Sequence, residues 1–133
     1  MPEIDIPALS EDDNRVYRAK VAGPAALLIA KLHKLGERQA TPNRLVDKDA
    51  HDVYRLLVAV PTDELARTMR ELRSDDLAGA VTEQAIVYLS EMFANGPDAT
   101  GSAMAGRAET GVGEPETVAN SVALLAADLL SAL

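Results

Sequence analysis

Residues 23–60, GPAALLIAKLHKLGERQATPNRLVDKDAHDVYRLLVAV, decide the fold, because they predict two amphipathic helices joined by a polar, proline-marked loop. We expect the first helix over residues 24–35 and the second over about residues 48–60. Pro24 favours a helix start, since its missing N–H does no harm there. Gly36 is the predicted stop of the first helix, and Asp47 is the predicted N-cap of the second.

Charged residues lie on the apolar faces of both helices. At about 100° per residue, these faces are formed by Leu27, Leu28, Leu32 and Leu35 and by Val53, Leu56, Leu57 and Val60. Lys31 falls in the middle of the first face, Asp49 inside the second, and Asp52 at its edge. An ionised group removed from water is costly unless it is paired. The pattern therefore predicts that Lys31 pairs with these aspartates.

The composition indicates one helical domain. The chain has 133 residues, is 47% hydrophobic and only 3% aromatic, so its core is built from Leu, Val, Ile and Ala. A formal net charge of −8 disfavours binding to DNA through its phosphates. The absence of cysteine excludes disulfides and thiol chemistry. No run of about 18 apolar residues and no secretory leader pattern is present, so a soluble cytoplasmic protein without a membrane partner is expected.

The segments on either side of residues 23–60 predict a short β element and three further helices. Residues 1–22 alternate around Ile4 and Ile6 and again over residues 16–21, which predicts two short strands. A third helix is expected over residues 62–73, capped by Thr62. Ser74 is the predicted cap of a fourth helix, which ends at Asn95. Its expected buried stripe consists of Leu77, Val81, Ala85, Tyr88, Leu89 and Met92.

Residues 96–114 are small and rich in glycine, and we expect a mobile loop there with a helical part near residues 103–108. Pro115 opens the last helix, whose apolar stripe is Val118, Val122, Leu125, Leu129 and Leu133, widened by Leu124 and Leu130. This stripe must pack back on the bundle or meet a second copy. The fold prediction is mainly α: a single domain, residues 1–133, with about five helices and a short N-terminal β element.

Parts of the chain resemble a known family. Residues 21–38 and 48–57 are similar to the C-terminal helical region of the nucleotidyltransferase-like toxins related to the AbiEii abortive-infection proteins, which act in toxin–antitoxin systems. The family pattern is a helical lysine, an arginine a turn or two later, and Arg/Lys-Asp-x-x-Asp opening the next helix. The positions that match it are Lys31, Arg38, Lys48, Asp49 and Asp52. The resemblance is strongest over residues 16–60.

The resemblance implies a nucleotide site. Lys31, Asp49 and Asp52 would be its catalytic residues, and Lys31 and Arg38 would contact the nucleotide. A nucleoside triphosphate and magnesium are the family's cofactors, and none is expected for this chain alone. The sequence departs from the family in one respect: the Gly-Ser turn followed by Asp-x-Asp, which carries the catalytic metal, is missing. Gly101-Ser102 is the only Gly-Ser pair, and it follows the helices.

Two interpretations of Lys31 with Asp49 and Asp52 are open. In the first, the lysine reaches triphosphate oxygens and a carboxylate fixes its position or accepts a proton. In the second, the group is a salt bridge that locates two helices. His33 and His51 fall opposite the apolar stripes, so we expect both to be exposed and predict no metal site.

The function predicted from sequence is that of the helical lobe of a nucleotidyltransferase-like protein, without transferase activity on its own. The alternative is a non-enzymatic interaction or dimerisation module with a structural Lys–Asp pair. The partners expected are a nucleotide, a second copy of the chain, a catalytic lobe or an antitoxin.

Overall fold

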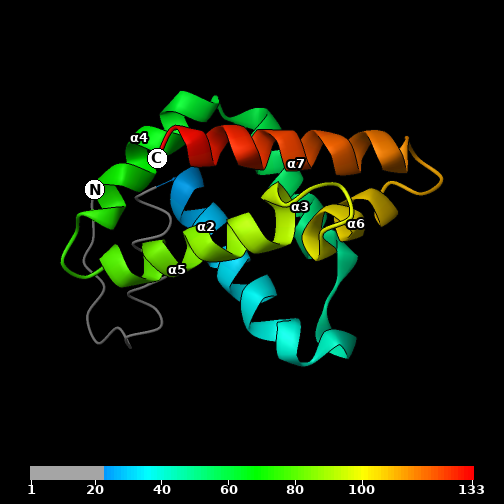
Figure 1. Cartoon of the computed structure of the whole chain (residues 1–133), viewed down its shortest axis with the longest axis horizontal. Helices are drawn as coiled ribbons and strands as arrows, with labels where there is room; N and C mark the ends of the chain where they lie inside the picture. Colours follow the sequence, from blue (N-terminus) through cyan, green and yellow to red (C-terminus); the bar gives the residue numbers. More distant parts are fainter. Residues whose placement is uncertain (1–22) are drawn as a thin grey trace, which may run out of the picture.

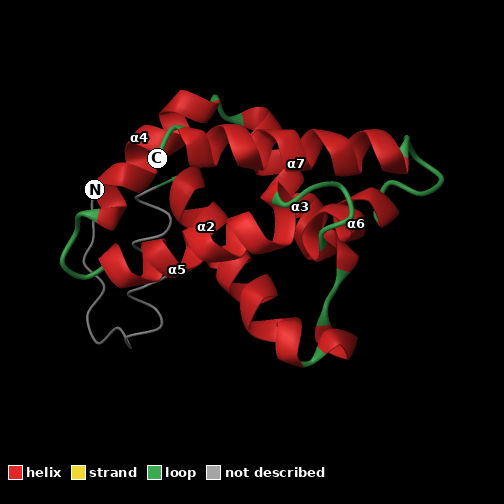
Figure 2. Ribbon diagram, in the orientation of Figure 1, coloured by secondary structure: helices red, strands yellow, loops and turns green. Residues whose placement is uncertain are grey.

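The computed structural model describes residues 23–133, which form six α-helices and contain no strand within that range (Figure 2). The mainly α prediction is confirmed, whereas the two predicted strands lie outside the described residues. The helices are α2 (Pro24–Glu37), α3 (Asp47–Ala59), α4 (Thr62–Arg73), α5 (Gly79–Leu89), α6 (Thr100–Arg107) and α7 (Pro115–Ser131). Short 3-10 turns at Arg38–Ala40 and Pro42–Arg44 connect α2 to α3.

The helices pack around one apolar core. Helix α7 runs along one side of the molecule, and α2 crosses the bundle behind α5 (Figure 1). Helix α2 packs on α3 and α5, α4 packs on α5 and α7, and α6 lies between α3 and α7. The segment joining α2 to α3 projects away from the bundle (Figure 1). After this segment the chain turns back, and α3 packs against α2. This packing brings the two charged stretches of the sequence together.

The buried face of α2 differs from the predicted one by a small rotation. Leu28, Leu32 and Leu35 are fully buried as expected, but Leu27 is 48% exposed. Ala25 and Ile29 are buried in its place. The rotation moves Lys31 from the middle of the apolar face to its edge. On α3 the prediction is confirmed more closely, since Val53 and Leu57 are buried and Leu56 and Val60 pack partly against the core.

The predicted ends of these two helices are wrong in detail. Gly36 does not stop α2, which continues to Glu37. Its lack of a side chain serves packing, because an added Cβ would lie 2.4 Å from the ring atoms of Tyr88. Asp47 makes no capping hydrogen bond, and it is the first residue of α3. Its carboxylate instead accepts two hydrogen bonds from Arg107, at 3.2 and 3.0 Å.

Helix α4 agrees with the prediction, with acidic residues in its first turn and Arg70 and Arg73 in its last. This charge arrangement suits the helix dipole. Thr62 itself makes no capping hydrogen bond. Arg70 Nη1 and Arg73 Nη2 donate to the carbonyl oxygens of Ala132 and Leu133, at 2.6 and 3.1 Å. The two arginines thereby tie the end of α4 to the end of α7.

Helix α5 begins later than predicted, at Gly79 rather than after Ser74. Residues 74–78 form turns in which the Asp75 carboxylate accepts from the N–H groups of Leu77 and Ala78. Leu77 and Val81 are exposed, because the buried stripe begins only at Thr82 and Ala85. A π-helical turn, Ser90–Ala94, follows α5 directly and carries Met92 and Phe93 into the core.

The helical part expected near residues 103–108 is present but begins earlier, because α6 spans Thr100–Arg107. The predicted mobile loop is therefore wrong for residues 100–102. Gly101, Ser102, Met104, Ala105 and Gly106 are buried. The Ser102 hydroxyl donates to the Phe93 carbonyl at 3.0 Å, and a Cβ on Gly101 would lie 2.6 Å from the Phe93 ring. The small residues of α6 thus let it pack closely on the π-helical turn. In the sequence alone, the same small residues had indicated flexibility.

Helix α7 packs back on the bundle. Val118, Val122 and Leu129 are buried as predicted, and Leu125, Leu130 and Leu133 pack partly against the core. Leu124 does not widen the buried stripe, since 66% of it is exposed. The other buried positions are alanines, Ala119, Ala123 and Ala126. Within the described range, no helix combines the length and the apolar character that crossing a membrane requires.

Candidate functional site

Lys31 lies at the centre of a group of charged side chains where α2 faces the first turns of α3. Its Nζ donates to Oδ2 of Asp52 at 2.9 Å and to Oδ1 of Asp49 at 3.3 Å. The predicted pairing of the lysine with both aspartates is therefore present. Asp49 precedes Asp52 by three residues, so both carboxylates project from one side of α3.

Asp49 is the buried carboxylate of this group. Its side chain is 8% exposed, and it faces three cations. In addition to Lys31, Lys34 Nζ donates to the Oδ1 atom of Asp49 at 3.2 Å, and Arg38 Nη1 lies 4.0 Å from Oδ2. Both oxygens of the buried carboxylate are thus engaged. Desolvation of an ionised carboxylate needs such compensation.

Asp52 occupies the outer side of the group. Its Oδ2 lies 3.8 Å from Lys48 Nζ, and the Lys48 side chain is 82% exposed. We call Lys31, Lys34, Arg38, Lys48, Asp49 and Asp52 the charge cluster. Its four cations and two carboxylates give it a formal charge of +2, in a chain whose formal net charge is −8.

The electrostatics of the charge cluster keep its central pair ionised. The hydrogen bond to Asp52 raises the pKa of Lys31 above its ordinary value of 10.5; partial burial opposes this shift and Asp49 adds to it. Burial tends to raise the pKa of Asp52, but the hydrogen bond and charge of Lys31 outweigh burial, with help from Lys48 and Arg55. The net pKa of Asp52 lies below 3.8.

The charge cluster fits an anion better than a magnesium ion. Magnesium is bound by oxygen ligands, but the oxygens of Asp49 face Lys31, Lys34 and Arg38, and Asp52 faces Lys31 and Lys48. A divalent cation placed there would be repelled by four neighbouring positive charges. Elsewhere in residues 23–133, no three His, Asp or Glu side chains are grouped in a way that could hold a metal ion. The cations, in contrast, match phosphate oxygens.

The structure brings together every site residue predicted from the sequence: Lys31, Arg38, Asp49 and Asp52. It also adds Lys34, which the sequence analysis missed. Lys34 follows Lys31 by three residues and therefore lies beside it on the helix. This spacing in the sequence could have predicted that Lys34 lies near the same aspartate. Lys48, which matches the family pattern, is exposed and lies within ion-pair distance of Asp52.

Both histidines are less exposed than predicted, because each has a partner outside its own helix. His33 Nε2 lies 2.8 Å from the Val81 carbonyl oxygen, and its ring packs edge-on against Tyr88. His51 Nε2 lies 2.5 Å from Oε2 of Glu109, 58 residues later. Each histidine side chain is about one-fifth exposed. The His51–Glu109 pair joins α3 to the segment that follows α6.

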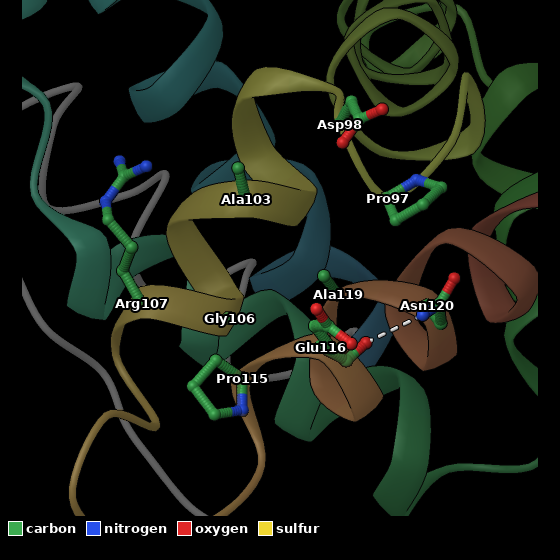
Figure 3. Close-up of a pocket in the computed structure, with 9 residues that line it drawn as sticks. All are labelled: Pro97, Asp98, Ala103, Gly106, Arg107, Pro115, Glu116, Ala119 and Asn120. Atoms are coloured by element: carbon green, nitrogen blue, oxygen red, sulfur yellow. Dashed lines mark hydrogen bonds between the residues drawn. The ribbon is translucent and has the colours of Figure 1, made fainter.

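A shallow groove lies between α6 and the first turns of α7 (Figure 3). Asp98, Arg107, Glu116 and Asn120 contribute polar side chains to its rim. The Asn120 amide donates to the Glu116 carbonyl oxygen at 2.9 Å, and Arg107 is engaged by Asp47. None of its lining residues belongs to the charge cluster, so the two features are separate.

Comparisons with protein-family models, characterised proteins and solved structures found no match to this chain. The assignment of a function therefore depends on the geometry of the charge cluster.

Proposed function

We propose that this chain is the helical lobe of a nucleotidyltransferase-like protein and that its charge cluster contacts the phosphates of a nucleoside triphosphate. The observation that carries the proposal is the convergence of Lys31, Lys34 and Arg38 on one buried carboxylate, Asp49. A salt bridge between two helices needs one cation for each carboxylate. The charge cluster has a surplus of two cations, at the surface of an acidic chain.

The proposal gives the cluster residues distinct roles. Asp49 is a positioning residue. From the buried side of the charge cluster it holds Lys31, Lys34 and Arg38 in place. Lys34 and Lys48 are 43% and 82% exposed, and so can reach a bound anion. Arg38 Nη1 also donates to the Arg44 carbonyl oxygen at 3.4 Å, which links it to the segment between α2 and α3. Prearranged cations of this kind bind phosphate without a large reorganisation.

We assign no transferase step to the described residues. Phosphoryl transfer depends on metal ions that bridge the phosphate oxygens, and the two carboxylates of the charge cluster are occupied by lysines. In the proposed function a partner, a catalytic lobe, supplies the groups that hold the metal, and this chain supplies part of the phosphate contact.

Thermal unfolding with and without nucleotide tests the proposal. A ligand that binds only the folded state stabilises it by about 2.7 kcal/mol at one hundred times its Kd, so ATP or GTP with magnesium should raise Tm by several degrees. Lys31→Ala should abolish the rise. Arg67→Ala, which removes an exposed arginine of α4, is the matched control and should retain it.

The second candidate is a non-enzymatic interaction module, and the exposed apolar residues around the start of α5 favour it. Leu77 is 70% exposed and Val81 is 48% exposed. If no nucleotide shifts the Tm of the wild-type protein, nucleotide contact is refuted for this chain. The charge cluster would then be a structural device, and a second copy, a catalytic lobe or an antitoxin would be sought at this surface.

A further inference from the structure

The two carboxylates of the charge cluster differ in position. Asp49 is buried and meets cations on both oxygens. Asp52 is 22% exposed and binds Lys31 and Lys48 through a single oxygen, Oδ2. The buried carboxylate therefore supports the cations from within the protein, and the outer one lies on the solvent side of the same lysine.

Asp52 stands where an incoming anion would have to bind. Its Oδ2 makes the shorter of the two hydrogen bonds to Lys31 Nζ, at 2.9 Å against 3.3 Å for Asp49. It also lies within ion-pair distance of the exposed Lys48. A phosphate oxygen that approached Lys31 from solvent would meet the same donors. Ligand and carboxylate would repel each other at such short range.

We propose that Asp52 is a built-in counter-anion that a polyphosphate displaces from Lys31 and Lys48. This inference rests on the proposed function and deepens it, because it assigns Asp52 the place that the linked phosphates of the ligand would take. A single phosphate can replace one carboxylate. A polyphosphate can also engage Lys34 on α2 and Arg38 just after it, which are both part-exposed and face the same carboxylate as Lys31.

Displacement is compatible with the packing of the charge cluster. When Asp52 turns away from Lys31, the lysine keeps its hydrogen bond to Asp49. Asp49 in turn keeps Lys34 and Arg38. No buried charge is left unpaired, so the exchange of Asp52 for a phosphate does not carry the cost of breaking a buried ion pair.

The inference predicts a gain of binding where a catalytic or positioning role of Asp52 would predict a loss. Inorganic tripolyphosphate is the probe, titrated by calorimetry at low salt against the full chain. Asp52→Asn should bind it more tightly by roughly 3- to 10-fold, because one nearby negative charge is removed while the shape is kept. Asp128→Asn changes the net charge equally at an exposed site on α7 and should bind like the wild type.

The outcomes separate this inference from the proposed function. Tighter binding by Asp52→Asn, lost again in Asp52→Asn with Lys34→Gln, supports the displacement. Equal or weaker binding by Asp52→Asn, with the wild type still binding, overturns the displacement and leaves the proposed function standing. An equal gain in Asp128→Asn also overturns it, since the effect would then belong to the net charge. If neither the wild type nor Asp52→Asn binds tripolyphosphate, the proposed function fails, and the displacement that rests on it fails too.

Discussion

At the scale of single residues, the structure gives Asp49 and Asp52 unequal importance for stability. Asp49 is 8% exposed and faces three cations, whereas Asp52 is 22% exposed and shares Lys31 with Asp49. Removing one partner of a buried charge group is costly because the remaining charges are left uncompensated. An exposed ion pair contributes little.

Asp49→Asn should therefore lower the free energy of unfolding by about 2–3 kcal/mol, which is less than for a fully buried pair, because its partner lysines are part-exposed. Asp52→Asn should lower it by less than about 1 kcal/mol. Urea unfolding followed by circular dichroism measures both. Equal losses in the two variants would contradict the distinction between a buried supporting carboxylate and an outer one.

The pairing of Lys31 with Asp49 was predictable because both residues fall on apolar helix faces, where an unpaired charge is costly. The convergence of Lys34 and Arg38 on the same carboxylate could not be predicted from the sequence. A lysine is long and flexible, and its direction depends on where α3 packs against α2. The same limit applies to His51 and Glu109, which are 58 residues apart. No local pattern connects two such positions.

At the scale of elements, α6 shows how one composition supports two structures. Residues 96–114 contain the small residues of a flexible linker, and those at 100–107 are also the small residues of a helix that packs closely against its neighbours. What decides between them is the surface that α6 meets: the Phe93 ring on the π-helical turn and the Pro115 carbonyl at the start of α7. Neither contact is visible in the sequence of the segment itself.

Gly101→Ala tests this packing directly. Alanine normally stabilises a helix by about 1 kcal/mol relative to glycine, and in a mobile loop the change would have little effect. Here the new Cβ would meet the Phe93 ring at 2.6 Å and the Met92 carbonyl oxygen at 2.8 Å. We expect a loss of about 1–3 kcal/mol in unfolding free energy, as for overpacked cores. A variant as stable as the wild type in thermal and urea unfolding would show that α6 is not tightly packed.

At the scale of the whole molecule, a net charge of −8 makes stability depend on pH in two opposing ways. Acid protonates carboxylates and so relieves their mutual repulsion. It also removes the favourable pairing of Asp52, whose pKa in the folded state lies below 3.8. A carboxylate with a lowered folded pKa contributes stability above its unfolded pKa and loses it as the pH falls through the folded value. Lys31, with its raised pKa, loses its contribution only above about pH 10.5.

The stability difference between the wild type and Asp52→Asn should thus be constant from about pH 5 to pH 9 and shrink below about pH 4. Urea unfolding at a series of pH values gives the difference directly, and the general charge repulsion largely cancels between the two proteins. A difference that stays unchanged down to pH 2 would mean that Asp52 does not pair in the folded state.

The π-helical turn at Ser90–Ala94 has a consequence for how the chain tolerates changes in length. An α-helix advances by about 100° per residue, and this turn holds one residue more than a regular turn would. It sets the rotational phase between Ala85 and Leu89, which precede it, and Phe93, which lies within it, and all three residues are buried. Deleting one residue here would leave the hydrophobic composition almost unchanged but rotate the only phenylalanine of the chain out of register with the core. Homologues that keep this architecture should therefore conserve the length of this segment more strictly than its residue identities.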